Sequence, residues 1–379
     1  MQRLENITGQ DPAGDILARY LHLRAGEFLR GLRLHREAGP DGHVADEAAR
    51  ALRATARRIG ATLGTFRPLL DAAWADQLRT ELAWLGVTLG GEHACAARLS
   101  RLIDALHRLS GGSGAPARGE AGALTVGAAR AGALLDRQLT PARTRAHSAA
   151  LQALGSSRFH AVADAVALLA SEVPLAPAAA ARAEEVLIPS ALAAQERLER
   201  AVAALPLARA ARPYNAEALV QESEGQDSPW HQVRRLLRLH RYAQELLHAG
   251  APDPGPGALA LDGLAPVAAH ACDPHLCGPR RDISPPRATA PDPAPGGRVP
   301  RDQLPCAARA LDRHREAAEA AAAAQAAART PRIAPATAYA LGVLHADQRH
   351  EVEAARFAFQ RIWQPVAVTT APAATTAAP

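Results

Sequence analysis

The feature that most constrains this chain is a helical spacing of apolar residues in long segments that are rich in Ala and Leu. Leu52, Ile59, Leu63, Phe66 and Leu70 recur at steps of three, four or seven residues. At about 100° per residue these side chains fall in one apolar stripe. Apolar residues make up 48% of the 379 residues and aromatic residues only 3%. Because Ala and Leu favour helices while aromatic and β-branched residues favour strands, the sequence predicts an all-α fold.

A second segment repeats this design about half a chain later. Its apolar side consists of Val233, Leu236, Leu237 and Leu247, and its opposite side carries His231, Arg234, Arg238 and Arg241. On the first segment the side opposite the apolar stripe carries Arg50, Arg53 and Arg57. These three arginines match His231, Arg234 and Arg238 at a constant offset of 181 residues (231 − 50). A fixed offset indicates an internal duplication, so we expect two pseudo-symmetric antiparallel helical bundles.

Composition also suggests how the chain is divided. We expect an N-terminal extension over residues 1–14, a helical domain over 15–363, and a disordered, low-complexity tail over 364–379. The first half of the domain covers about 15–120 and the second about 121–363. Within the second half, residues 250–305 are dense in Pro and Gly and lack an apolar period, which predicts an irregular segment.

Several shorter signals predict where helices end. A loop is expected over residues 111–119, which read GGSGAPARG. Further breaks are expected near Gly155, Pro174, Pro189 and Pro213, and around residues 330–335, because Gly and Pro interrupt helices.

The basic stripes need an explanation because like charges on one helix face repel one another. The chain has 43 basic residues, all arginine, and a formal net charge of +5. A bound anion would neutralise such a stripe, and two stripes facing each other would form a cationic channel. The alternative is an ordinary solvated polar face. The repetition of the stripe favours a polyanion site, for which the planar guanidinium group is well suited.

Residues 48–70 (AARALRATARRIGATLGTFRPLL) resemble the first signature helix of the conserved-histidine α-helical domain family, CHAD. Residues 231–245 (HQVRRLLRLHRYAQE) resemble the second signature helix. Three further stretches are similar to the family pattern, namely residues 81–90, 154–159 and 339–363. The resemblance therefore extends over most of the chain, from about residue 15 to residue 363.

This resemblance implies two pseudo-symmetric helical bundles whose basic residues line a central groove. It also implies binding of inorganic polyphosphate, association with polyphosphate granules, and no catalytic activity. The matched positions are Arg53, Arg57, Arg58, His231, Arg234, Arg238 and Arg241, and Arg50 stands where the family has its first histidine.

The chain departs from the family pattern at several positions. Gly60 replaces an arginine of the first signature helix, Ala83 replaces a lysine, and His93 and Ala94 replace an Arg-Asp pair. In place of the expected Gly-Glu-His-Gln-Asp-like stretch, the chain has its Pro/Gly-rich segment. These departures are typical of a divergent member of the family.

A weaker candidate site is a group of metal-ligand residue types in the Pro/Gly-rich segment: His270, Cys272, His275 and Cys277. Thiolate and imidazole are the usual ligands of structural zinc. However, four ligands crowded into eight residues fit no common zinc spacing, so a loop that happens to contain Cys and His is the preferred interpretation.

The sequence contains no Gly-x-Ser-x-Gly, P-loop or His-Glu-x-x-His motif, so we expect a binding protein and not an enzyme, without a cofactor. The N-terminus lacks the order of a signal peptide, and no apolar run reaches the length of a membrane span, which predicts a cytoplasmic, bacterial-type protein. The first alternative is a helical scaffold that has lost its ligand. The second is nucleic-acid binding, which the lack of aromatic residues between the arginines disfavours.

Overall fold

The computed structural model describes residues 11–38, 42–111, 120–212, 224–249 and 303–363. Within these ranges the protein is helical and contains no strand, and its extended contacts are two isolated bridges, Pro12 with Arg182 and Leu70 with Leu175. The predicted all-α fold is therefore confirmed. Among the described helices, none combines the length and the hydrophobicity that crossing a membrane would require.

The first part of the chain forms four helices and one short 3₁₀ turn. They are α1 (Ala13–Glu37), α2 (Gly42–Thr65), η1 (Arg67–Leu69), α3 (Ala72–Thr88) and α4 (Gly91–Gly111). Pro68 lies in the first turn of η1, which follows α2 after Phe66. The carboxylate of Asp71 then accepts a hydrogen bond of 2.9 Å from the backbone N–H of Trp74, which caps the N-terminus of α3.

The second part is longer and less regular. It comprises α5 (Glu120–Leu154), α6 (Ser157–Ser171), η2 (Pro177–Ala180), α7 (Ala183–Ala203), α8 (Leu207–Ala210), α10 (Glu224–Ala249), α11 (Leu304–Ala328) and α12 (Pro335–Trp363). The hydroxyl of Ser156 caps α6 by accepting a hydrogen bond from the backbone N–H of Phe159. The break near Gly155 is thus reinforced by a favourable capping residue.

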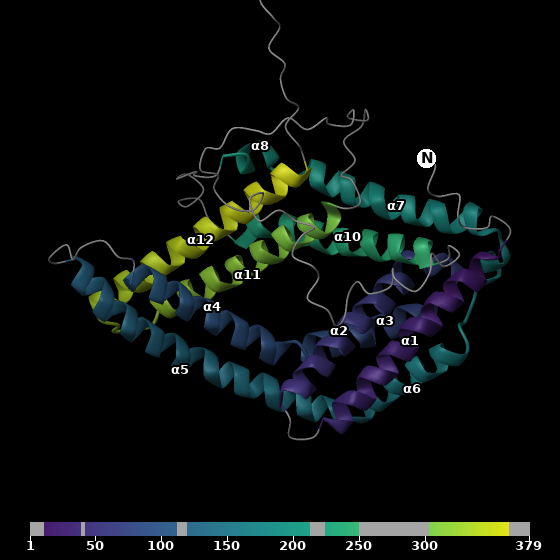
Figure 1. Cartoon of the computed structure of the whole chain (residues 1–379), viewed down its shortest axis with the longest axis horizontal. Helices are drawn as coiled ribbons and strands as arrows, with labels where there is room; N and C mark the ends of the chain where they lie inside the picture. The colour runs from purple at the N-terminus through teal and green to yellow at the C-terminus, as the bar shows by residue number, and fades with distance from the viewer. Residues whose placement is uncertain (1–10, 39–41, 112–119, 213–223, 250–302, 364–379) are drawn as a thin grey trace, which may run out of the picture.

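The two basic helices occupy equivalent places in the fold. Helix α2 packs between α1 and α3, α10 packs between α7 and α11, and α2 and α10 contact each other. Figure 1 shows α2 and α10 meeting near the middle of the molecule. The 181-residue offset in sequence therefore corresponds to a repeated arrangement in space, which confirms the two helical bundles.

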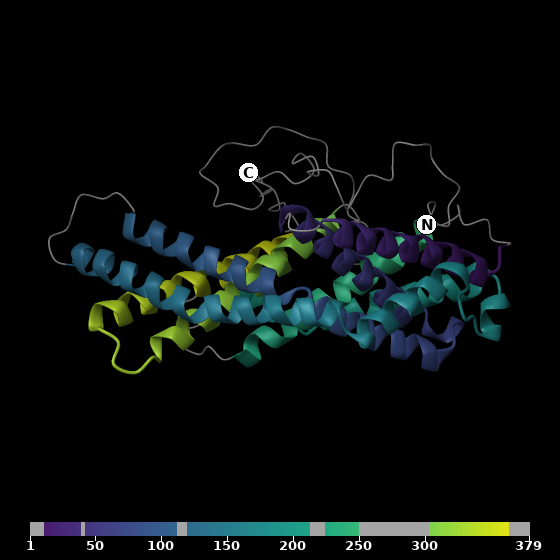
Figure 2. The same ribbon diagram turned by 90° about the horizontal axis from the view of Figure 1, so that it is seen from below.

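Three sizeable hydrophobic cores hold the helices together. One lies among α1, α2, α3, α6 and the first half of α7. A second joins the end of α7, α8, the start of α10 and α11, and the end of α12. The third lies among α4, α5, α11 and α12 at the far end of an elongated, flattened molecule (Figures 1 and 2). Helix α10 contributes to the first and second cores, so it connects the two halves.

The predicted apolar stripes are the buried faces of the two basic helices. Leu52, Ile59, Leu63, Phe66 and Leu70 are each at most 2% exposed. On α10, the predicted residues are also buried: Val233, Leu236, Leu237 and Leu247. Because the apolar faces pack against the cores, the arginines on the opposite faces of both helices point away from the cores.

Some predicted boundaries shift. The expected break at Pro189 is wrong, because α7 continues through this residue while Leu187 and Ala191 pack in the core. Helix α1 begins two residues before the expected domain start, and α11 begins at Leu304, inside the predicted irregular segment, since proline is well tolerated in a first helical turn.

The breaks near Gly155, Pro174 and residues 330–335 are confirmed. Pro213, the loop after Gly111, the rest of the irregular segment and the tail lie outside the described residues.

Candidate functional site

A cavity of about 590 Å³ lies among four helices, α2, α4, α10 and α11. Its walls carry basic residues from every one of these helices: Arg53, Arg57, His93, Arg98, Arg101, Arg234, Arg238, Arg241 and Arg315. The other polar residues of the lining are Tyr242, Asp312, Glu316 and Glu319. The contact between α2 and α10 brings residues that are 181 positions apart in sequence to one site.

Five of the eight predicted site residues line this cavity, namely Arg53, Arg57, Arg234, Arg238 and Arg241. The other three, Arg50, Arg58 and His231, are not among its lining residues. The shared spacing of the two basic helices therefore predicts the centre of the cavity but not its limits.

Arg58 lies on the buried side of α2. Its side chain is 8% exposed, and its Nε lies 3.3 Å from a carboxylate oxygen of Glu245 on α10. The guanidinium carbon also lies 5.5 Å from the centre of the Tyr242 ring. These contacts link α2 to α10, so Arg58 supports the cavity from behind.

Arg50 and His231 occupy matching positions at the outer ends of their stripes, and both side chains are exposed. The Nε of Arg50 donates a hydrogen bond of 3.2 Å to the backbone oxygen of Asp46, one turn earlier on α2. The His231 ring meets that of His314 edge to face at 5.4 Å. Although part of its side chain reaches solvent, desolvation of the ring by the neighbouring helices, together with the nearby charges of Arg234 and Arg315, lowers the pKa of His231 below its ordinary value of 6.5.

The structure adds three arginines that sequence reasoning missed, Arg98 and Arg101 on α4 and Arg315 on α11. The spacing of Arg98 and Arg101 equals that of Arg50 and Arg53, which is a signal that the sequence did contain. Arg101 donates to the side-chain oxygen of Gln348 on α12 at 2.6 Å. The contribution of α11 could not be predicted from the sequence, because this helix follows the Pro/Gly-rich segment and contains no motif that matches the basic helices.

The departures from the family pattern also reach the cavity. His93 and Ala94, which stand where the resemblance implies an Arg-Asp pair, both line it. Gly60 and Ala83 are not among its lining residues. The altered pair therefore changes the cavity itself, whereas the other two substitutions lie beyond its walls.

Charge in the cavity is unbalanced, since eight arginines face three carboxylates. Arg53, Arg57 and Arg238 form no salt bridge with any residue in the described part of the chain. Burial and the neighbouring Arg234 lower the pKa of Arg238 to about 10. Burial and Arg57 lower that of Arg53 in the same direction. Both shifts mean that the surroundings disfavour positive charge in the cavity, so an anion would be stabilised there.

Local packing fixes the position of Arg53. A Cβ atom added to Gly90, between α3 and α4, would lie 3.2 Å from Nε of Arg53 and 2.9 Å from the backbone oxygen of Gly86. The Nε atom is buried and has no hydrogen-bond partner among the described residues. Glycine at this position therefore leaves space for a cationic side chain whose hydrogen-bonding capacity is still available.

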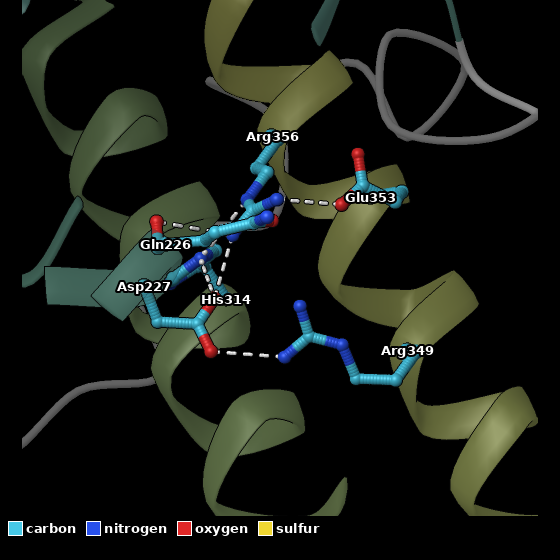
Figure 3. Close-up of polar contacts among 6 residues, drawn as sticks. All are labelled: Gln226, Asp227, His314, Arg349, Glu353 and Arg356. Carbon is cyan, nitrogen blue, oxygen red and sulfur yellow. Dashed lines mark hydrogen bonds and ion pairs between the residues drawn. The ribbon is translucent and has the colours of Figure 1, made fainter. Parts of the chain in front are cut away.

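A second charged region lies beside the cavity, where the start of α10 meets α11 and α12 (Figure 3). The two carboxylate oxygens of Asp227 lie 2.9 Å from a guanidinium nitrogen of Arg349 and 2.6 Å from one of Arg356. Arg356 also binds Glu353 at 2.6 Å. His314 lies 3.4 Å from Asp227 and stacks on Trp230, which is 1% exposed and belongs to the core. This group, called the buried ion cluster below, is enclosed and internally compensated.

The four candidate zinc ligands, His270, Cys272, His275 and Cys277, lie outside the described residues. Elsewhere, the described ranges contain no group of three or more His, Cys, Asp or Glu residues placed to hold a metal ion. The zinc hypothesis therefore stays a prediction from the sequence.

Comparison with known proteins gives the family. The model of the CHAD domain matches residues 24–261, which is more than half of the chain. A solved structure of PptA from Streptomyces chartreusis is 54% identical in sequence and has a TM-score of 0.68, and the match covers 93% of this chain and all of that one. No curated protein matches the chain. The matched residues include both basic helices that meet at the cavity, and the chain belongs to the CHAD family.

Proposed function

We propose that this protein binds inorganic polyphosphate in the cavity among α2, α4, α10 and α11. The observation that carries the proposal is the excess of arginines over carboxylates in the lining, concentrated on the two helices that match the family's signature helices. A chain of phosphates supplies negative charge at regular intervals. It would therefore neutralise several of these arginines at once.

The arginines also suit phosphate chemically. A planar guanidinium group can donate two parallel hydrogen bonds to neighbouring phosphate oxygens, and it stays protonated even when partly buried. Arg53 and Arg57 from one repeat and Arg238 and Arg241 from the other line the same cavity. A bound polyphosphate would contact both repeats, so its binding would hold the two halves of the molecule together.

The proposed role is binding without catalysis. The described lining contains no serine, threonine, cysteine or lysine that would act as a nucleophile. All three of its carboxylates form ion pairs with arginines, namely Asp312, Glu316 and Glu319. We further propose that the protein acts in the cytoplasm where polyphosphate accumulates, including polyphosphate granules.

The test is a calorimetric titration with long-chain polyphosphate at low and high salt, repeated with single-stranded DNA as competitor. We expect binding that weakens steeply as salt increases, because a protein that neutralises a polyanion releases its counterions. Arg137→Ala is a matched control, because Arg137 is exposed on α5 and does not line the cavity. This variant should bind like the wild type.

Two results would point to the alternatives. A wild-type protein that fails to bind polyphosphate at low salt would indicate a helical scaffold without the ligand. Equal competition by single-stranded DNA, at matched charge, would indicate a general polyanion or nucleic-acid site.

A further inference from the structure

All three carboxylates of the cavity come from one helix. The lining residues of α2, α4 and α10 are arginine, histidine, alanine and tyrosine, whereas α11 contributes Asp312, Glu316 and Glu319. These residues are four and three positions apart, so they lie on one face of α11. We call them the acidic stripe. The cavity therefore has one wall of mixed charge and other walls that are wholly cationic or neutral.

The acidic stripe already binds some of the arginines. Asp312 lies 2.5 Å from Nε of Arg234 on α10. Glu319 lies 2.8 Å from a guanidinium nitrogen of Arg98 on α4, and 2.8 Å from one of Arg315 on α11 itself. Three arginines of the lining are thus occupied by carboxylates of the protein.

These pairs are partly exposed, with side-chain exposures of 47% for Asp312 and 36% for Glu319. Ion pairs in contact with water contribute little to stability, since solvent screens them. Their effect on a ligand is larger, because a phosphate that approaches Arg98 or Arg234 meets a carboxylate already in place. Two negative groups would then compete for the same guanidinium.

Other arginines of the lining have no carboxylate in a salt bridge with them. Arg53 and Arg57 on α2 and Arg238 on α10 form no salt bridge in the described ranges. We call these three residues the α2–α10 side of the cavity; Arg234, also on α10, is left out because it is paired with Asp312. A polyanion is therefore attracted first to this side, where the arginines are not paired with carboxylates of the protein.

We propose that the acidic stripe of α11 confines polyphosphate to the α2–α10 side of the cavity by keeping Arg98, Arg234 and Arg315 occupied. This inference rests on the proposed function and specifies how the ligand lies. The three carboxylates act as specificity-determining residues. They limit the number of phosphates that one protein molecule neutralises, and a longer chain gains less from the α4–α11 side, where Arg101 is the lining arginine that the stripe does not pair.

The experiment compares wild type with Asp312→Asn/Glu319→Gln. The control is Glu172→Gln/Glu185→Gln, which removes two negative charges from exposed residues outside the cavity. Affinity is measured for long-chain polyphosphate and for tripolyphosphate over a series of salt concentrations. Thermal unfolding checks that all three proteins are folded.

We expect the cavity variant to bind long-chain polyphosphate at least about tenfold more tightly, with a steeper dependence of affinity on salt. The steeper slope follows because Arg98 and Arg234 are released and displace further counterions from the chain, while Arg315 keeps only its longer contact of 3.8 Å with Glu316. Tripolyphosphate is short enough for the α2–α10 side, so its affinity should rise less. The control variant should keep the wild-type salt slope.

The outcomes separate the two proposals. If wild type binds and the cavity variant shows an unchanged salt slope, or equal gains for both ligands, the confinement is refuted while the proposed function stands. If only the cavity variant binds, the acidic stripe prevents binding instead of confining the ligand, and both proposals are refuted for the wild type. If neither protein binds at low salt, both proposals fail.

Discussion

The cavity and the buried ion cluster share helices α10 and α11, yet they treat arginine in opposite ways. In the cavity, eight arginines face three carboxylates, and the site is open to solvent. In the buried ion cluster, Arg349 and Arg356 are balanced by Asp227 and Glu353, and each of these side chains is nearly inaccessible (Figure 3).

The comparison shows that the number of arginines does not distinguish a binding site from a structural one. Charge balance and burial distinguish the two kinds of site. A buried charge must be paired within the protein, since removing it from water is very unfavourable. A partly exposed cavity can keep an excess of positive charge, at the cost of mutual repulsion that a ligand would relieve.

The largest expected effect tests the structural side of this comparison. Asp227→Asn removes the carboxylate that Arg349 and Arg356 share. Breaking a buried ion pair from one side leaves uncompensated charge, so the free energy of unfolding should fall by about 3–5 kcal/mol. Chemical denaturation measures this loss. A decrease below about 1 kcal/mol, the range typical of exposed pairs, would show that the cluster does not stabilise the fold.

A second prediction concerns pH. Burial and the nearby Arg356 lower the pKa of His314 to about 4, from an ordinary value of 6.5. The folded protein therefore favours the neutral imidazole, so the stability from this residue is complete above pH 6.5 and is lost as the pH falls from 6.5 towards 4. The loss should reach roughly 3 kcal/mol, as the unfolded chain binds the proton more readily.

Denaturation between pH 7 and pH 4 measures this effect, with His314→Gln as the comparison. The glutamine does not titrate, so the decrease over this interval should become smaller in the variant. Asp227 contributes little to the result: despite burial, its hydrogen bonds with His314 and Arg349 lower its pKa below the ordinary value of 3.8, so most of its own loss lies below the pH interval measured. An identical pH profile for both proteins would contradict the assignment.

The same comparison explains what the sequence could predict. Helical periodicity identified the buried faces of α2 and α10, and these faces determine where the arginines point. The family resemblance placed Arg58 in the basic set but could not show that Glu245 would pair with it, because that partner is distant in sequence. It also could not assign Arg315 to the cavity, since this depends on how α11 packs after a long segment without periodicity.

A third prediction tests the binding side. Arg53→Ala and Arg238→Ala should each weaken polyphosphate binding by about 1.5–3 kcal/mol, the range for charge-assisted hydrogen bonds. Neither change should lower stability appreciably, because each removes a charge that repels its neighbours.

Arg58→Ala is the matched contrast and should mainly lower stability, because Arg58 links α2 to Glu245. Calorimetry and denaturation on the three variants measure both quantities. Variants of Arg53 and Arg238 that bind like wild type would place the ligand elsewhere.

The smallest effect is expected at Gly60, seven residues after Arg53 and therefore on the same face of α2. A Cβ atom added there meets no atom within 4 Å, so a side chain is sterically allowed. Gly60→Ala should stabilise the protein by about 0.5–1 kcal/mol, because glycine is unfavourable inside a helix. Gly60→Arg should gain less stability, because its charge repels Arg57 three residues earlier. It should also extend the cationic stripe beyond the cavity, which should strengthen binding of long-chain polyphosphate. Thermal unfolding and titration of both variants separate the backbone effect from the charge effect. If Gly60→Arg binds no better than Gly60→Ala, the stripe on α2 attracts ligand only within the cavity, and the distinction between the cavity and the surrounding surface becomes sharper.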